Sequence, residues 1–366
     1  MDMGSSGTSA ARTAHERRHG TPRRGRRHDA STHAEDAVQP DDARIAAALN
    51  WAARAAYGPA AHLTRWRATE LTNRGGRRVV RYDLTLSGGA TGAMGEMNGT
   101  RPVRWIGKFY DSAETAARVA ATLRELEAGG YTERCGARAP SVVSYDPGLR
   151  LLLATFEPGE PVVSQLDGDW RVIVPAVARA LAALHALPAP DWGNAMPAEI
   201  VADLRRRVDA LCDWLPDQAA ALRTTLARLE RRAVVLPAPA ALTHGDFGAG
   251  QLLWERGRLV VLDFDKCGRG DPALDLGNFT AQLRRRALLD GLAAPIHEMR
   301  NLLLDVYAHE AGDADDRDDL AARVTWYEQI VLLRRVHFFA RQGTDEWRER
   351  ALRLFHLLTE PLDGAE

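Results

Sequence analysis

Apolar positions recur with two different spacings along the chain, and the change of spacing divides it into two parts. Between residues 60 and 157, β-branched and aromatic residues gather in short runs separated by turn residues, which predicts strands. After residue 158, apolar residues recur every three or four positions over long stretches, which predicts helices. The pattern therefore predicts an α+β chain in which a small antiparallel sheet precedes a mostly helical part.

The first part is expected to contain five strands and two helices. The first two strands are joined by TNRGG, a turn sequence that suits a hairpin, and Ser112 is the expected N-cap of the second helix. The expected elements are helix 44–58, strands 63–71, 77–86, 103–110, 141–147 and 149–162, helix 112–130, and, in the second part, helices 170–188, 198–216, 217–233, 275–291, 295–312 and 320–343.

Residues 1–43 differ from the rest because they contain Arg, His, Gly, Ser and Pro but almost no large apolar residue. Such a segment cannot bury enough apolar surface to offset the entropy lost on ordering, so we predict a disordered basic tail. Its RRGRR cluster could contact nucleic acid, but a solvated tail is the simpler interpretation. We accordingly expect three regions: the tail 1–43, a nucleotide-binding lobe 44–157 and a helical lobe 158–366.

Composition narrows the choice of protein class. The 366 residues carry a formal net charge of −1, which argues against nucleic acid as a partner of the whole surface. Cys135, Cys212 and Cys267 lie far apart, which predicts neither a disulfide framework nor a zinc site and fits a reducing compartment. No apolar run approaches the ~20 residues of a membrane span, and no secretory signal is evident. We therefore expect a cytoplasmic protein with no membrane contact, whose oligomeric state stays open.

A group of polar residues interrupts the second part between residues 242 and 275. Asp246 lies in a loop that contains glycines, and Asp263 follows the apolar strand RLVVL, 17 residues later. The hairpin between them can bring both carboxylates, together with the amide of Gln251, to one site. Carboxylate and amide oxygens are hard ligands that hold Mg²⁺ together with phosphate oxygens. The sequence therefore predicts a site for phosphoryl transfer.

The order of these residues resembles a known family. His244, Gly245 and Asp246 form HGD, Asp263 ends the apolar strand, and the segment 270–275 reads GDPALD. This pattern is similar to that of the aminoglycoside phosphotransferase and choline kinase-like family, relatives of the protein kinases. The resemblance implies a two-lobed protein-kinase-like fold over about residues 60–360, and a small-molecule kinase that uses ATP and Mg²⁺.

The resemblance also implies catalytic and metal-binding roles. Asp246 would orient the acceptor hydroxyl and accept its proton, while His244 and Asp275 would support the catalytic loop. Asp263 would bind Mg²⁺, and Gln251 occupies the position where the family usually has Asn. The acceptor would be a small molecule with a hydroxyl group: a sugar, an aminoglycoside or an amino alcohol.

For the nucleotide, the resemblance implies two contacts. Lys108, in the third expected strand, would pair with the α- and β-phosphates. The segment Thr155, Phe156 and Glu157 would be the hinge between the lobes and would offer backbone groups to adenine.

Gln251 is the first departure from the family pattern. Its amide can still ligate Mg²⁺, but the extra methylene moves the oxygen by about 1.5 Å if the backbone stays fixed. Mg²⁺ tolerates little error at its ~2.1 Å ligand distance. Either the loop adjusts, or one metal is weakly bound, or a water intervenes. The alternative to an active kinase is a pseudokinase or a nucleotide-binding interaction protein without turnover.

The second departure concerns the partner of Lys108. The family has a Glu on the helix after the third strand, whereas the closest alignment puts Val119 at that position. Glu114 and Glu125 lie on the same helix, and we leave the partner open. Asp265, two residues after Asp263, could be a second metal ligand.

Several other residues have a structural and a functional interpretation. Asp271 is expected to cap the turn at Pro272, and His185 to pack near a helix end. The acidic segment 311–319 could attract a cationic acceptor, although a solvated loop is the simpler interpretation. Arg334 or Arg335 could face phosphates or a neutral sugar, or could be exposed helix charges. The glycine-rich segment 87–100 is interpreted as a surface loop, because no helix follows it.

Overall fold

In the computed structural model of the chain, the described residues are 40–74, 77–88, 99–193, 196–233, 240–312 and 317–359. Most of the expected tail and of segment 87–100, and part of segment 311–319, lie outside these ranges. Within them, no helix combines the length and the apolar character that crossing a bilayer requires.

A five-stranded antiparallel sheet forms the first part of the fold, as the runs of β-branched and aromatic residues predict. Its strand order is β1-β2-β3-β5-β4. The strands are β1 (His62–Arg74), β2 (Arg77–Ser87), β3 (Thr100–Phe109), β4 (Val142–Asp146) and β5 (Leu151–Thr155). Every second residue of β2 from Val80 to Leu86 is buried, which is the period of a strand with one face in a core. The central strand β3 carries Lys108, which lies opposite Val79 of β2 and Leu152 of β5.

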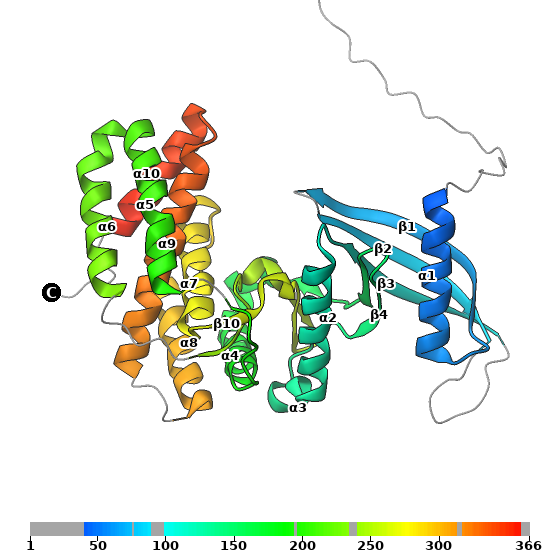
Figure 1. Ribbon diagram of the computed structural model, residues 1–366. Coiled ribbons are helices and arrows are strands. Elements are labelled where there is room, and N and C mark those ends of the chain that lie inside the picture. The colour runs from blue at the N-terminus through cyan, green and yellow to red at the C-terminus, as the bar shows by residue number, and fades with distance from the viewer. Residues whose placement is uncertain are drawn as a thin grey trace, which may run out of the picture. The chain divides into compact units, whose positions relative to one another are not determined.

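The helix α1 (Pro40–Tyr57) covers one face of this sheet (Figure 1). Its buried residues Leu49 and Ala52 share a core cluster with Tyr82 and Trp105 of the sheet. The helix begins at Pro40, so the last four residues of the segment 1–43 belong to α1. Proline and acidic residues stabilise a first helical turn, where backbone N–H groups have no intrahelical acceptor.

The helices α2 (Ala113–Ala128) and α3 (Tyr131–Cys135) follow β3. The side chain of Ser112 accepts a hydrogen bond from the Thr115 N–H, which confirms the expected N-cap. Val119 and Leu123 of α2 belong to the core cluster of the helical part, whereas the residues of α1 belong to the core of the sheet.

The second part is mostly helical, as the longer apolar period predicts. Figure 1 shows α5, α6, α9 and α10 gathered beside one another. The helices are α4 (Leu166–His185), α5 (Pro197–Trp214), α6 (Ala219–Ala233), α7 (Ala273–Leu289), α8 (Ile296–Ala311), α9 (Arg317–Ala340) and α10 (Asp345–Thr359). They bury one shared core.

Two small sheets position the polar segment 242–275. One contains β6 (Glu160–Pro161), β8 (Leu252–Glu255) and β9 (Arg258–Val261), and the other pairs β7 (Ala241–Thr243) with β10 (Gly268–Gly270). Thr243 lies opposite Gly268 in the second sheet. This pairing holds the residues that follow β7 beside the residues that precede β10.

The helices α7 and α9 approach each other closely at Gly277. A Cβ atom at this position would lie 2.6 Å from the Cβ of Tyr327 and 3.0 Å from the backbone nitrogen of Glu328. Both neighbours belong to a buried stretch of α9 and are not the ends of flexible side chains. The close crossing therefore depends on the absence of a side chain at Gly277.

We expect Gly277→Ala to lower the free energy of unfolding, even though alanine favours a helix over glycine by about 1 kcal/mol. Overpacking in a filled core costs about 1–3 kcal/mol, and fixed backbone atoms leave the new methyl group little room. Urea and thermal unfolding midpoints measure the effect. The matched control is Gly168→Ala in the first turn of α4, where no atom lies within 4 Å of the added carbon. Equal stability of the two variants would contradict the close-packing argument.

Candidate functional site

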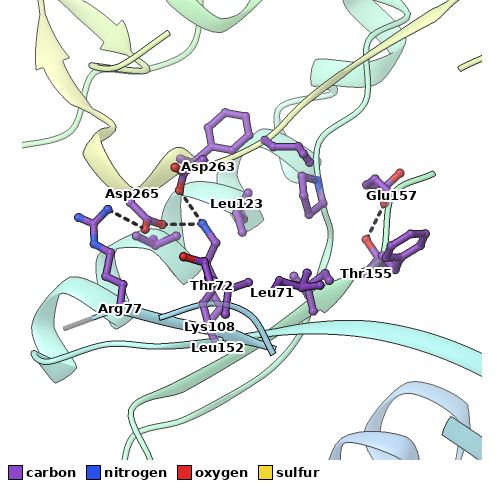
Figure 2. A pocket seen from close by; sticks show the side chains of 18 of the residues that line it. Leu71, Thr72, Arg77, Lys108, Leu123, Leu152, Thr155, Glu157, Asp263 and Asp265 are labelled. Carbon is purple, nitrogen blue, oxygen red and sulfur yellow. Dashed lines mark hydrogen bonds and ion pairs between the residues drawn. The ribbon is translucent and has the colours of Figure 1, made fainter. Parts of the chain in front are cut away.

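A cavity of about 540 Å³ lies between the sheet and the polar segment. Lys108 lines it from β3, Thr155 to Glu157 line it from the last residue of β5 onward, and Asp263 and Asp265 line it from the residues after β9 (Figure 2). The remaining walls are largely apolar and include Ile106, Val119, Leu123, Leu152, Ala154 and Leu253. A mostly apolar cavity of this size with a few polar groups at one side is typical of a small-molecule site.

Lys108 lies between two carboxylates in this cavity. Its Nζ atom donates to Asp263 Oδ1 at 2.6 Å and to Asp265 Oδ1 at 3.1 Å (Figure 2). Burial alone would lower the pKa of Lys108, but the carboxylates of Asp265 and Asp263 together raise it above its ordinary value. Burial alone would raise the pKa of Asp263, but the positive charge of Lys108 outweighs this effect, so the pKa of Asp263 is lowered. The lysine is therefore held cationic and Asp263 anionic.

Asp263 adopts an unusual backbone conformation. It has φ of 65° and ψ of 56°, which is the left-handed region, and it directly precedes the short helix η4 (Phe264–Lys266). This conformation is uncommon for residues other than glycine, although Asp and Asn tolerate it best. It turns the chain where the strand β9 has ended, and the Asp263 side chain remains 44% exposed. The carboxylate is thus available to a ligand in the cavity.

The loop after β7 carries Asp246. Gly245 has φ of 80°, a conformation that a glycine adopts without strain. The Asp246 side chain is 37% exposed, and its Oδ2 atom accepts a hydrogen bond of 2.6 Å from Lys266 Nζ. Because Lys266 is three residues after Asp263, this contact links the loop of Asp246 to the segment of Asp263.

Asp275 anchors the same loop from the first turn of α7. Its Oδ2 accepts from the His244 N–H at 2.6 Å and its Oδ1 from the Gly245 N–H at 2.9 Å. The Asp275 side chain is fully buried, so these charge-assisted bonds hold the loop firmly. His185 Nε2 also lies 3.2 Å from Asp275 Oδ2. His185 does lie at the end of α4, as expected, but it additionally bonds to this carboxylate.

His244 joins the loop to the strand that precedes Asp263. Its Nε2 lies 2.9 Å from the Leu262 carbonyl, which requires the proton on Nε2. The ring is buried between Phe247 and Phe264, with ring centroids 5.5 and 5.1 Å away. His244 therefore supports the loop through Nε2, while its buried Nδ1 atom has no hydrogen-bond partner among the described residues.

Gln251 has a side chain suited to a cation. Its Oε1 atom is buried and accepts no hydrogen bond from the described part of the chain. A buried acceptor without a donor is costly, and a metal ion would satisfy it. The Gln251 carbonyl accepts from the Leu262 N–H at 2.9 Å, so Gln251 lies beside the residue before Asp263.

The donor set fits Mg²⁺ only together with a ligand. No cluster of three or more His, Cys, Asp or Glu side chains suited to a metal occurs among the residues that the structure describes. Mg²⁺ is commonly held by one or two protein groups plus phosphate oxygens and water. Asp263 and Gln251 would hold the ion in this way, with Asp265 within the same segment.

The hinge segment offers fewer backbone groups than the sequence suggests. The Thr155 N–H already donates to the Ser141 carbonyl at 3.0 Å, and the Phe156 N–H to the Arg104 carbonyl at 3.4 Å. The Glu157 N–H has no acceptor within the described ranges. The Thr155 hydroxyl donates to Glu157 Oε1 at 2.7 Å, which shapes this end of the cavity (Figure 2).

Asp265 is the residue whose place the sequence did not reveal. It is nearly buried, with 4% of its side chain exposed, and it contacts Arg77, Lys108 and Tyr110. Burial first, and then the Asp265 carboxylate, raise the pKa of Tyr110. The sequence signal for this site residue was a second acidic residue two positions after Asp263. Its partners, however, lie more than 150 residues earlier in the chain.

Three further residues considered from the sequence, Asp271, Arg334 and Arg335, differ in their surroundings. Asp271 Oδ1 accepts from the Ala273 N–H at 2.9 Å, which confirms the expected cap, and it also pairs with the buried Arg323. Arg334 of α9 pairs with Asp203 of α5 at 3.2 Å, so its charge is already paired within the helical part. The pKa of Arg335 is lowered, first by burial and then by Arg285, and Asp246 offsets only part of this shift.

Comparison with protein families gives one match. A model of the phosphotransferase enzyme family covers residues 85–307, more than half of the chain. The matched range includes Lys108, Asp246 and Asp263. Comparison with curated proteins gives no match.

Solved structures with the same fold are distant in sequence. A thermostable mutant of aminoglycoside phosphotransferase APH(4)-Ia, in a ternary complex with ADP and hygromycin B, is 14% identical, with a TM-score of 0.52 over 81% of this chain and 94% of that one. Macrolide 2'-phosphotransferase MphH from Brachybacterium faecium is 19% identical, with a TM-score of 0.51 over 87% and 99%. Choline kinase from Cryptosporidium parvum is 12% identical, with a TM-score of 0.51 over 80% and 88%.

At these identities the solved structures establish the fold, which is the expected two-lobed kinase-like fold. The family match adds the class of reaction. The chain belongs to the phosphotransferase enzyme family and is an ATP-dependent phosphotransferase.

Proposed function

We propose that the chain transfers the γ-phosphoryl group of ATP to a hydroxyl group of a small molecule, with Asp246 as catalytic base and Asp263 and Gln251 as metal ligands. One observation carries this proposal. Lys108 Nζ lies 2.6 Å from Asp263 Oδ1, and Lys266, three residues later, lies 2.6 Å from Asp246 Oδ2. Two contacts thus connect the proposed phosphate-binding lysine with the proposed base, which supports one site for both substrates.

The proposed roles follow from what phosphoryl transfer requires. The reaction needs an oriented hydroxyl, clamped phosphates and neutralised charge, and little covalent help from the protein. Asp246 would accept a hydrogen bond from the acceptor hydroxyl and take its proton as the phosphoryl group is transferred. Lys108 would bind the phosphates, and bound Mg²⁺ would neutralise their charge. The anchored loop amides of His244 and Gly245 would keep Asp246 in position.

The donor site is the cavity of about 540 Å³. Its apolar walls suit a flat base, and the Glu157 N–H, for which no acceptor is found within the described ranges, would serve a polar ring edge. The complexes of APH(4)-Ia with ADP and with AMP-PNP support an adenine nucleotide as the donor.

The acceptor class stays open among sugars, aminoglycosides and amino alcohols, and two arginines near the proposed base bear on it. Arg335 of α9 and Arg285 of α7 lie within electrostatic range of one another, and Arg335 within that of Asp246. Guanidinium groups donate hydrogen bonds to sugar hydroxyls, so Arg335 is a candidate contact for an acceptor, whereas Arg285 already pairs with Asp290 at 3.0 Å. The acceptors named for the similar structures, hygromycin B and gentamicin among them, are starting points for a screen.

The test is ADP release in the presence of MgATP, measured across neutral sugars, amino sugars, aminoglycosides and amino alcohols. Acceptor-dependent release supports the proposal. If MgATP stabilises the protein against heat but no class of acceptor is turned over, the pseudokinase alternative is favoured. If neither MgATP nor ATP with EDTA shifts the unfolding midpoint, the proposed nucleotide site is wrong.

Gln251→Asn should keep turnover within about tenfold of the original, because both amides offer the same oxygen and about 1.4 kcal/mol covers the adjustment of geometry. Gln251→Leu, which matches the volume but lacks the oxygen, should raise the Mg²⁺ concentration needed for half-maximal rate. Mg²⁺ titrations of ADP release measure both. An unchanged Mg²⁺ requirement in Gln251→Leu would remove Gln251 from the metal site.

A further inference from the structure

A lysine that grips phosphates needs a carboxylate that stays with it when nucleotide and metal arrive. In the structure, Asp263 is the closest carboxylate to Lys108, at 2.6 Å. A bound metal would compete with Lys108 for the Asp263 carboxylate, so this contact alone does not fix Lys108 in the loaded enzyme. Another group must hold the lysine in that state.

The helix α2 does not supply this group. Val119 and Leu123, which α2 presents to the cavity, are apolar and nearly buried. Glu114 and Glu125 are exposed to solvent, and neither contacts Lys108 in the part of the chain that the structure describes. Neither candidate considered from the sequence is therefore the partner.

Asp265 has the geometry that the role requires. Its Oδ1 accepts from Lys108 Nζ at 3.1 Å and from the Tyr110 hydroxyl at 2.8 Å, and its Oδ2 lies 3.3 Å from Arg77 Nη1 (Figure 2). These contacts come from β2, β3 and the residue after β3. They fix both oxygens of a side chain that is only 4% exposed. Asp265 is thus held in place independently of Lys108 and of any ligand.

We propose that Asp265 is the positioning residue for Lys108 and takes the place of the missing helix glutamate. The inference rests on the proposed function, because it assigns Lys108 to the phosphates. Lys108 and the metal ligand Asp263 are then positioned by one short segment, 263–265, and no movement of α2 is needed to place the lysine. When Asp263 binds the metal, Asp265 keeps the Lys108 ammonium group directed into the cavity.

Asp265→Asn tests the proposal through nucleotide affinity at saturating Mg²⁺, the state in which the metal engages Asp263. The variant should bind MgATP about tenfold more weakly, equivalent to about 1.4 kcal/mol, and its KM for ATP should rise by a similar factor with a smaller change in kcat. Adenosine, which has no phosphate, should bind as to the original protein. Removing a negative charge beside a triphosphate would by itself strengthen binding, so weaker binding would come from the lost orientation of Lys108.

Two further variants keep the test decisive. Tyr110→Phe removes one hydrogen bond to Asp265 at nearly constant volume and should weaken ATP binding in the same direction by about two- to fivefold, equivalent to about 0.4–1 kcal/mol. Glu114→Gln, an exposed α2 acid, is the matched control and should bind ATP as the original protein does. Asp265→Glu should restore part of the affinity lost in Asp265→Asn.

Unchanged ATP affinity at saturating Mg²⁺ in both Asp265→Asn and Tyr110→Phe overturns the inference, as does an effect of Glu114→Gln alone. An Asp265→Asn variant that needs more Mg²⁺ for half-maximal rate but binds ATP normally at saturating Mg²⁺ would make Asp265 a metal ligand instead. Equal loss of adenosine and ATP binding would show a merely structural role. Failure of the original protein to bind ATP at all would count against the proposed function.

Discussion

Asp246→Asn should lower kcat by roughly 10²–10⁴, the range that general acid–base catalysis contributes, while the affinity for MgATP stays within about twofold. The amide has the same shape as the carboxylate and can still accept a hydrogen bond from Lys266, so the loop keeps its position. It cannot accept the proton of the acceptor hydroxyl. Steady-state ADP release gives kcat, and a thermal-shift titration gives the nucleotide affinity of the same preparation.

The matched control is Asp305→Asn. It neutralises an α8 carboxylate that pairs with Arg317 of α9 and lies outside the cavity. It should leave kcat unchanged. Turnover of Asp246→Asn within a factor of two of the original would remove Asp246 as the catalytic base.

Asp263→Asn should lower turnover by at least about a hundredfold, comparable to the loss of one preorganised electrostatic contact to a transition state. It should also abolish the difference between the stabilisation by MgATP and that by ATP with EDTA. A neutral amide is a weaker Mg²⁺ ligand than a carboxylate, and Lys108 loses its anionic neighbour at 2.6 Å. Thermal unfolding in the two nucleotide conditions measures the metal-dependent part directly.

The choice of substitution matters because Asp263 has φ of 65°. Asn tolerates this conformation and Gly adopts it freely, whereas Ala would add backbone strain to the loss of the ligand. Asp263→Gly is therefore the proper control and should match Asp263→Asn in activity. A metal-dependent shift that survives in both variants would contradict Asp263 as the metal ligand.

Local patterns were sufficient for much of the fold. Runs of β-branched and aromatic residues and the apolar period of the helices predicted a five-stranded sheet followed by helices, and the structure confirms both. The start of α1 was missed because Pro40 and the acids that follow it resemble a polar tail when only apolar content is counted. Burial of Leu49 and Ala52 against the sheet stabilises a helix whose first turn carries no large apolar residue.

The short sequence spacing of most candidate site residues also predicted that they lie close together. His244, Asp246, Asp263 and Asp275 lie in one stretch of sequence, and the β7–β10 pairing keeps them near one another. The use of the Thr155 and Phe156 amides was not predictable, because their acceptors, the carbonyls of Ser141 and Arg104, lie on other segments.

By itself, the sequence determined the class of fold, the order of its elements and the residue types of a phosphoryl-transfer site, because these depend on periodicity and on short-range spacing. Only the tertiary structure decided which carboxylate holds Lys108. Its neighbours Asp263 and Asp265 are 155 and 157 residues away in the chain. The helix that would have supplied a glutamate presents Val119 and Leu123 instead. Contacts over such separations are set by how the sheet packs against the helical part, and local sequence carries no record of them.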